Sequence, residues 1–316
     1  MTEEIEIPSV DTFVDGALLA ESFAGAVAVT RHLYDQLGSS EPPLQTLTHV
    51  ASGIARGANN LAYPSVVAFS SVGRDDAARA VQSAFLAVAV ARALDDSPAV
   101  LAGIALAALL VDAGRARLAR ESSIDLEVFR ELPDSLDLLC PAATAALGVQ
   151  HSPSALCEAA SLMAFEAAWL ERPRLGRLHR GKLPPLLSSR ILRACRALLE
   201  RIAPRKNEDT ATPLDALAHL ARDLESDPAA FALLRNVIGS VPVGTVVELE
   251  SGEWGVVGPE ASCQPGQPVL HLVVDSKGQV AEQPELLDLD GIPVRIVRAI
   301  EARDVHFNVA RALARA

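Results

Sequence analysis

The 316-residue sequence is short of aromatic side chains, which make up 4% of it, and of cysteine, with four residues and no CxxC pair. Scattered cysteines argue against a disulfide-bonded protein and favour a reduced, cytoplasmic one. The chain also lacks an excess of basic residues. Its net charge of −12 argues against binding of nucleic acid polymers or acidic membranes by the whole surface. The acidic start, MTEEIEIPSVD, lacks the basic and apolar regions of a signal peptide, so no leader is expected.

Alanine and leucine are abundant, and half of the residues are hydrophobic, which favours packed helices. The most apolar stretch, residues 98–112, reads PAVLAGIALAALLVD and predicts a helix. Pro98 suits the first helical position, and Asp96 or Ser97 can cap it. Its uncharged part is shorter than the ~20 residues that cross a bilayer, and no other stretch is long enough. We therefore expect a central helix of a soluble bundle that breaks at Ala113-Gly114-Arg115.

The helical spacing of apolar residues predicts further helices before and after this one. In the segment 186–202 the apolar residues share one face, while Arg193, Arg196 and Glu200 are expected to point away, with Arg196 and Glu200 as a pair. The other predicted helices span residues 10–38, 44–55, 74–94, 140–147, 153–170, 213–224 and 228–238, with a short helix and loop in 121–137 and irregular segments at 172–185 and 204–212.

After Gly239 the period changes to the alternation that is typical of strands. Ser251-Gly252 and Lys277-Gly278 are predicted turns between paired strands, and PVRIVRAIE gives a last strand or the start of a helix. The result is a small antiparallel β module of roughly 60 residues, near the lower size of an independent domain. We expect it to pack on the helices.

Several segments resemble HD-GYP domains, the cyclic-di-GMP phosphodiesterase branch of the HD superfamily. LAALLVDAGRARLA is similar to the family's LLHDIGK stretch, SSRILRACRALL to its SRILAVADAYDAL helix, and VPVGTVVELESGEWGVV to its YPVGTLVELSSGEVGVV extension. The resemblance covers about residue 74 to the C-terminus. It implies a mainly α fold, an HD-type helical bundle with a small C-terminal antiparallel β module. The implied division is a helical segment 1–73, a degenerate core 74–240, and a β module with tail 241–316.

The resemblance also locates the family's metal site, which binds two or three ions through His and Asp. Only one ligand is retained, as Asp112, and the following Lys of the family is Arg115. Glu171-Arg172 keeps the ER that follows the paired His, and the GYP signature is absent. The positions matching the family's ligands are Arg79, Val111, Asp112, Cys140, Trp169, Leu170 and Arg196.

One carboxylate cannot hold two divalent ions, and arginines at positions 79 and 196 place cations where metals would lie. We therefore expect Asp112 to be salt-bridged, or capped by backbone N–H groups, and the metal site to be lost. Asp112 is then a vestigial residue with a structural role at a helix end, and no catalytic residue is assigned.

The segment 171–206 contains 11 Lys or Arg residues against two acids. One interpretation is a solvated face whose cations pair with acidic residues elsewhere, and it is the favoured one. The other is an anion site for a phosphodiester or an acidic partner, in which Arg115, Arg190, Arg205 and Lys206 bind nucleotide phosphates.

The leading functional hypothesis is a non-catalytic HD-GYP-like scaffold for signalling or protein interaction. It has no cofactor, a protein partner of unknown identity and homodimerisation as an option, and cyclic-dinucleotide sensing is left open. The alternative is an active cyclic-di-GMP phosphodiesterase with an altered site that uses Fe or Mn. A third hypothesis is an effector that binds the dinucleotide without cleaving it.

Overall fold

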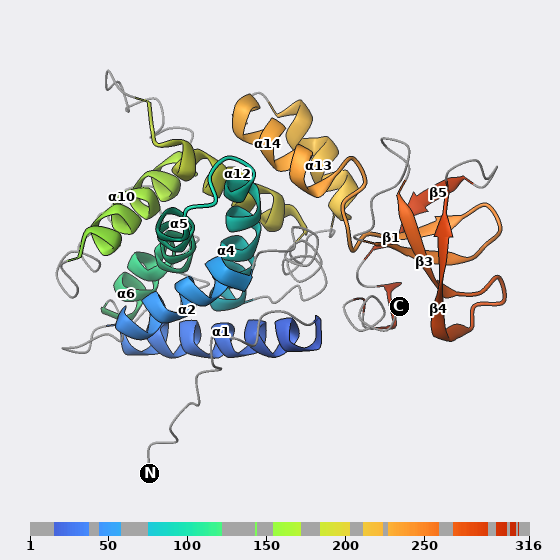
Figure 1. Ribbon diagram of the computed structural model, residues 1–316, viewed down its shortest axis with the longest axis horizontal. Helices are drawn as coiled ribbons and strands as arrows, with labels where there is room; N and C mark the ends of the chain where they lie inside the picture. The colour runs from blue at the N-terminus through green and yellow to red at the C-terminus, as the bar shows by residue number, and fades with distance from the viewer. Residues whose placement is uncertain are drawn as a thin grey trace, which may run out of the picture.

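The computed structural model describes residues 16–37, 44–57, 75–121, 143, 154–171, 184–202, 211–223, 227–258, 268–289, 295–301, 304–307 and 309. These residues form a mainly helical protein with a C-terminal antiparallel sheet, which confirms the predicted fold class at this level (Figure 1). The helices are α1 (Gly16–Gln36), α2 (Leu44–Gly57), α4 (Asp76–Arg92), α5 (Pro98–Leu110), α6 (Ala113–Glu121), α10 (Ala155–Leu170), α12 (Leu187–Ile202), α13 (Pro213–Arg222) and α14 (Pro228–Ile238).

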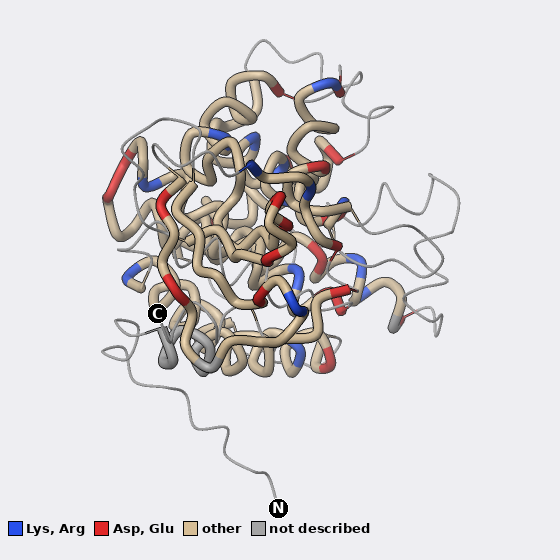
Figure 2. The backbone as a smooth tube through the Cα atoms, turned by 90° about the vertical axis from the view of Figure 1, so that its right-hand side faces the viewer, with Lys and Arg blue, Asp and Glu red and all other residues tan. Residues whose placement is uncertain are grey.

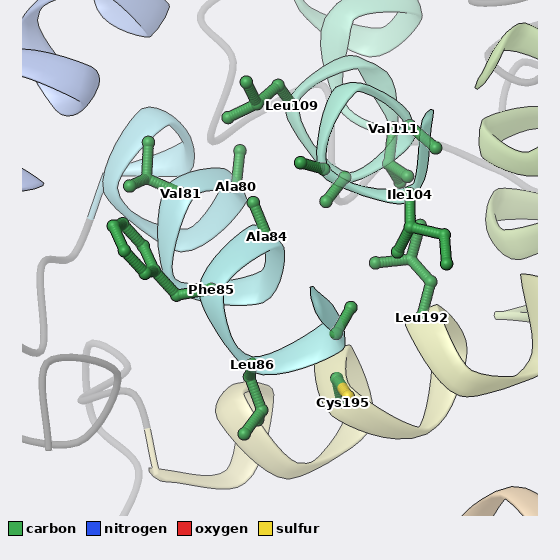
Figure 3. Close-up of a cluster of buried hydrophobic side chains, with 14 of the residues drawn as sticks. Ala80, Val81, Ala84, Phe85, Leu86, Ile104, Leu109, Val111, Leu192 and Cys195 are labelled. Carbon is green, nitrogen blue, oxygen red and sulfur yellow. The ribbon is translucent and has the colours of Figure 1, made fainter. Parts of the chain in front are cut away.

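Two neighbouring helices, α4 and α5, form the centre of the helical part. The carboxylate of Asp75 caps α4 by accepting from the N–H of Ala78 at 2.8 Å, and Pro98 occupies the first turn of α5. Nearly every side chain of both helices is buried, and many are alanines, which let other helices approach closely (Figure 3). A Cβ atom at Gly103 would lie 3.3 Å from the Met163 side chain, so this glycine brings α10 close to α5.

The central helix does end in this region, but the break lies at Val111 and Asp112, and the predicted position, Ala113-Gly114-Arg115, is helical. Helix α5 ends at Leu110, Val111 and Asp112 form a turn, and α6 then begins at Ala113. The N–H of Val111 donates to Ala107 O and that of Ala116 to Asp112 O, both at 3.0 Å, so helical hydrogen bonding flanks the turn on both sides. Glycine is tolerated inside a helix when the surrounding packing favours the helix.

The helical path through this turn, Pro98–Ala119, is long and apolar enough to cross a membrane by length and composition, contrary to the sequence-based expectation. However, 83% of its most apolar window is buried inside the protein. A buried core helix passes the same test of length and composition.

The later helices begin near the predicted positions because side chains cap them. Thr212 Oγ1 accepts from the N–H of Asp215 at the start of α13, and Asp227 accepts from the N–H groups of Ala229 and Ala230 at the start of α14. Predicted features that lie outside the described residues are the start of the first helix, its end at Gly38, the helix 140–147, and most of the segments 121–137, 172–185 and 204–212.

The sheet contains β1 (Val246–Leu249), β2 (Trp254–Val257), β3 (Val269–Val274), β4 (Val280–Asp288) and β5 (Ile296–Ala299), in the order β4-β3-β2-β1-β5. Both predicted turns are confirmed, with positive φ at Gly252 (+83°) and Gly278 (+81°). Among the described residues, the apolar clusters of the sheet share no residue with the helical core. The packing of the module on the bundle therefore stays a prediction.

Candidate functional site

Three charged side chains meet inside the helical part, where α5 and α10 end beside the middle of α12. Asp112 follows α5, Glu171 directly follows α10 as its C-cap, and Arg196 lies in α12. Their side chains are 4%, 10% and 5% exposed, respectively. We refer to Asp112, Glu171 and Arg196 as the buried ion cluster.

The guanidinium of Arg196 binds both carboxylates at once. Its Nη1 donates to Asp112 Oδ2 at 2.9 Å and its Nη2 to Asp112 Oδ1 at 3.1 Å, which is a bidentate pair. Its Nε donates to Glu171 Oε1. Every nitrogen of the guanidinium therefore has an acidic partner, and both oxygens of Asp112 accept from the same cation.

This geometry confirms the prediction that Asp112 is salt-bridged, and its partner is Arg196, which the resemblance matched to a metal ligand. It also corrects the prediction that Arg196 points away from the protein and pairs with Glu200. Arg196 is buried, and Glu200 instead lies 3.7 Å from Arg193. Apolar periodicity places charged residues outside, whereas here two buried carboxylates hold the cation inside.

Two further arginines lie around the cluster. Arg115 Nη1 is 3.5 Å from Asp112 Oδ1, and Arg79 Nη2 is 3.5 Å from the buried Asp76 Oδ1. The Arg79 charge also acts on Asp112 electrostatically. The side chains of Arg79 and Arg115 are only 16% and 17% exposed, so the cluster lies in a region of concentrated, balanced charge.

The cluster keeps its acidic members ionised. Burial raises the pKa of Asp112, but the charges of Arg196 and Arg115 and the hydrogen bonds from Arg196 outweigh it and lower the pKa to about 2. Burial likewise raises the pKa of Glu171, and the charges of Arg196 and Arg193 lower it below its ordinary value. Burial alone would lower the pKa of Arg196, but the negative charges of Asp112 and Glu171 raise it above its ordinary value.

The described residues do not fit the metal centre that the resemblance to HD-GYP domains implies. They contain no group of three or more His, Cys, Asp or Glu side chains that could hold a metal ion. The oxygens of Asp112 that would bind a metal instead accept hydrogen bonds from Arg196, whose fixed charge repels a second cation. Cys140 lies outside the described residues, and Val111 and Trp169, which the resemblance matches to metal ligands, have side chains that do not bind metals.

The residues proposed for nucleotide binding do not gather into one site in the described part of the chain. Arg115 contacts Asp112, whereas Arg190 binds Asp227 with its Nε and, at 2.9 Å, with its Nη2. That Asp227 also caps α14, so Arg190 connects α12 to α14. Arg205 and Lys206 lie outside the described residues, and nucleotide binding by these four residues stays a prediction.

The cations of the basic segment that the structure describes all have acidic neighbours, as the favoured interpretation of this segment expects. In the view of Figure 2 basic and acidic positions are interleaved along the chain. The pairs are Arg190 with Asp227, Arg193 with Glu200, Arg196 with Asp112 and Glu171, and Arg201 with Asp223.

Sequence reasoning assigned no role to Glu171, Asp76 or Tyr34. The Tyr34 hydroxyl donates to Leu109 O at 3.0 Å and so connects α1 to the last turn of α5. Glu171 could have been found from the resemblance, which matches it to the ER pair beside the metal ligands. Asp76 gave no such signal, since it stands at the start of a helix, where acidic residues are ordinary.

Comparisons of the chain with protein-family models, with curated proteins and with solved structures find no match.

Proposed function

We propose that the chain is a non-catalytic scaffold, similar to an HD-GYP domain that keeps its helices and has exchanged its metals for an arginine. One observation carries the proposal: Arg196 binds both oxygens of Asp112 and also Glu171. A guanidinium neutralises carboxylates as a metal ion does, but it cannot lower the pKa of a bound water to produce a hydroxide nucleophile. The arrangement therefore suits stability rather than hydrolysis.

The remaining parts of the hypothesis are predictions from the sequence. They are a cytoplasmic location, an unidentified protein partner, a homodimer and cyclic-dinucleotide sensing. The paired state of Arg190 gives no support to a phosphate contact at that residue.

A hydrolysis assay tests the proposal. The purified full chain is incubated with cyclic di-GMP and added Mn²⁺ or, without oxygen, Fe²⁺, and linear product is measured by chromatography. Asp112→Asn, prepared identically, is the matched control for a contaminating phosphodiesterase. The proposal predicts the same background for both proteins. Turnover by the wild type that disappears in Asp112→Asn would establish the alternative, an active enzyme with an altered site.

Ligand sensing has its own test. Calorimetric titration with cyclic di-GMP should show binding that weakens with added salt and in Arg115→Ala if the chain is an effector. A flat titration leaves the protein-interaction scaffold, for which light scattering after size exclusion determines whether the chain is a homodimer.

A further inference from the structure

Helix α10 is apolar on its outer side as well as on its inner side. It packs on α5 and α12 and lies at the margin of the helical part, with α5 between it and α4 (Figure 1). Of its 16 residues, only Glu158 and Glu166 are charged. Leu162 is 49% exposed, and Ala155 and Ala159 are exposed as well. A helix that is apolar all round is ordinarily covered on every side.

Two aromatic side chains continue this apolar surface toward the end of α10. Phe165 and Trp169 lie three and seven residues after Leu162, a spacing that places all three on the same side of a helix. Both are partly exposed, and their ring centroids are 5.8 Å apart. The chain is poor in aromatic residues, and Trp169 is one of its two tryptophans. Aromatic residues are enriched in the buried centres of protein interfaces.

The start of α12 widens the surface. Leu186, directly before α12, and Leu187, its first residue, are 43% and 42% exposed. Glu166 Oε2 accepts from the N–H of Leu186 at 2.9 Å and from Ser189 Oγ at 2.7 Å, which places Leu186 beside α10. One of the two charges of α10 is therefore engaged within the chain. We define the outer face as Ala155, Ala159, Leu162, Phe165, Trp169 and Leu186.

We propose that the outer face binds the outer face of a second copy of the chain, with the two α10 helices antiparallel about a two-fold axis at Leu162. In such a pair the same surface is buried on both copies, so it must complement itself. Reversing the helix places Ala155 at the level of Trp169 of the other copy, and Ala159 at the level of Phe165. Each bulky ring then lies at a level where the other helix carries only a methyl group. This self-complementarity favours a second copy over an unrelated protein.

The charges of α10 are compatible with this pairing. Glu158 and Glu166 lie on opposite flanks of Leu162, about 80° apart around the helix, so the two glutamates at one level do not face each other directly. Glu166 is engaged with Ser189, and Glu158 lies at the rim, where charged residues of an interface are ordinarily found. The proposal specifies the surface of the homodimer expected from the sequence. It does not depend on the loss of catalysis, since no residue of the outer face belongs to the buried ion cluster.

Sedimentation equilibrium of the full chain at rising concentration tests the pairing. We expect wild type to dimerise and Leu162→Glu to raise the dimer dissociation constant about 100-fold or more, because the two-fold axis places the new charge twice in an apolar interface. Val280→Glu replaces an apolar residue of the sheet that is 58% exposed, and this matched control should dimerise as wild type does. Circular dichroism verifies that both variants are folded. A monomeric wild type, or a dimer that Leu162→Glu leaves intact, overturns the proposal.

Cysteine cross-linking tests the antiparallel axis without introducing a charge. The two copies of a residue on the axis face each other, so Leu162→Cys should form a covalent dimer on mild oxidation. Ala155→Cys would lie about 20 Å from its counterpart and should not cross-link. Wild type gives the background from the four native cysteines. Equal cross-linking of the two variants, or none above wild type in either, overturns the proposal, whereas the hydrolysis assay bears only on the loss of catalysis.

Discussion

Helix α12 carries two bidentate arginine–aspartate pairs, and their surroundings differ. The side chains of Arg196 and Asp112 are 5% and 4% exposed. Those of Arg190, six residues before Arg196 on α12, and its partner Asp227 are 28% and 27% exposed. Both pairs are bidentate, and besides their burial they differ in that Arg196 also binds Glu171 and Asp227 also caps α14. A buried pair must compensate the loss of water around both charges, and neither partner can return to water if the other is removed. In the partly exposed pair, the remaining partner can return to water when the other is removed.

The comparison predicts the largest effect for Arg196→Ala. The variant leaves Asp112 and Glu171 buried without their cation, and we expect a loss of about 3–5 kcal/mol in the free energy of unfolding. Urea denaturation followed by circular dichroism measures it. A loss as small as that of an exposed pair would mean that water enters the cluster freely and that burial does not control its energetics.

Acid should weaken the same pair. The lowered pKa of Asp112 means that its contribution is present above the ordinary value of 3.8 and is lost as the pH falls toward about 2. That lowering corresponds to about 2 kcal/mol. Wild type should therefore lose part of its advantage over Asp112→Asn as urea unfolding is repeated from pH 6 down to pH 3. A constant difference between the two proteins across this series would contradict the ion-paired state of Asp112.

Arg190→Ala is the matched variant at the exposed pair. Because Asp227 can return to water and still caps α14, the expected loss is about 1 kcal/mol or less, and it should shrink further in high salt. The same urea series measures it. An effect as large as that of Arg196→Ala would remove burial as the explanation of the difference.

Replacing the whole cluster should have the smallest effect. The triple variant Asp112→Leu, Glu171→Met and Arg196→Met leaves no buried charge among these positions, so its stability should lie within about 1 kcal/mol of wild type or above it. Unfolding midpoints of the triple variant and of Arg196→Ala are compared directly. If the triple variant is as unstable as the single one, the cluster stabilises the fold by more than mutual neutralisation.

Much of the architecture could be predicted from the sequence because local rules determine it. The start of α14 follows from Asp227 and Pro228, and the two sheet turns follow from Gly252 and Gly278. The continuation of the chain as α6 could not be predicted, because Ala113 and Ala116 are buried in the core and this packing overrides the glycine signal at Gly114.

The candidate site, too, was predictable from the sequence only in part. The salt bridge of Asp112 was predicted from the arginines that stand at the positions matched, by resemblance, to metal ligands. The partner, Arg196, was expected on the outside because helical periodicity counts every arginine as polar. Which arginine enters the interior depends on where Glu171 lies, and that is decided by the packing of α10 against α12.

Metal binding by the intact chain tests the central claim most directly, namely that Arg196 serves in place of metal ions at Asp112 and Glu171. The purified protein is dialysed against Mn²⁺, desalted and analysed for bound metal beside Asp112→Asn. The account predicts a substoichiometric, equal metal content in both proteins. Stoichiometric Mn²⁺ in the wild type that is lost in Asp112→Asn would contradict it.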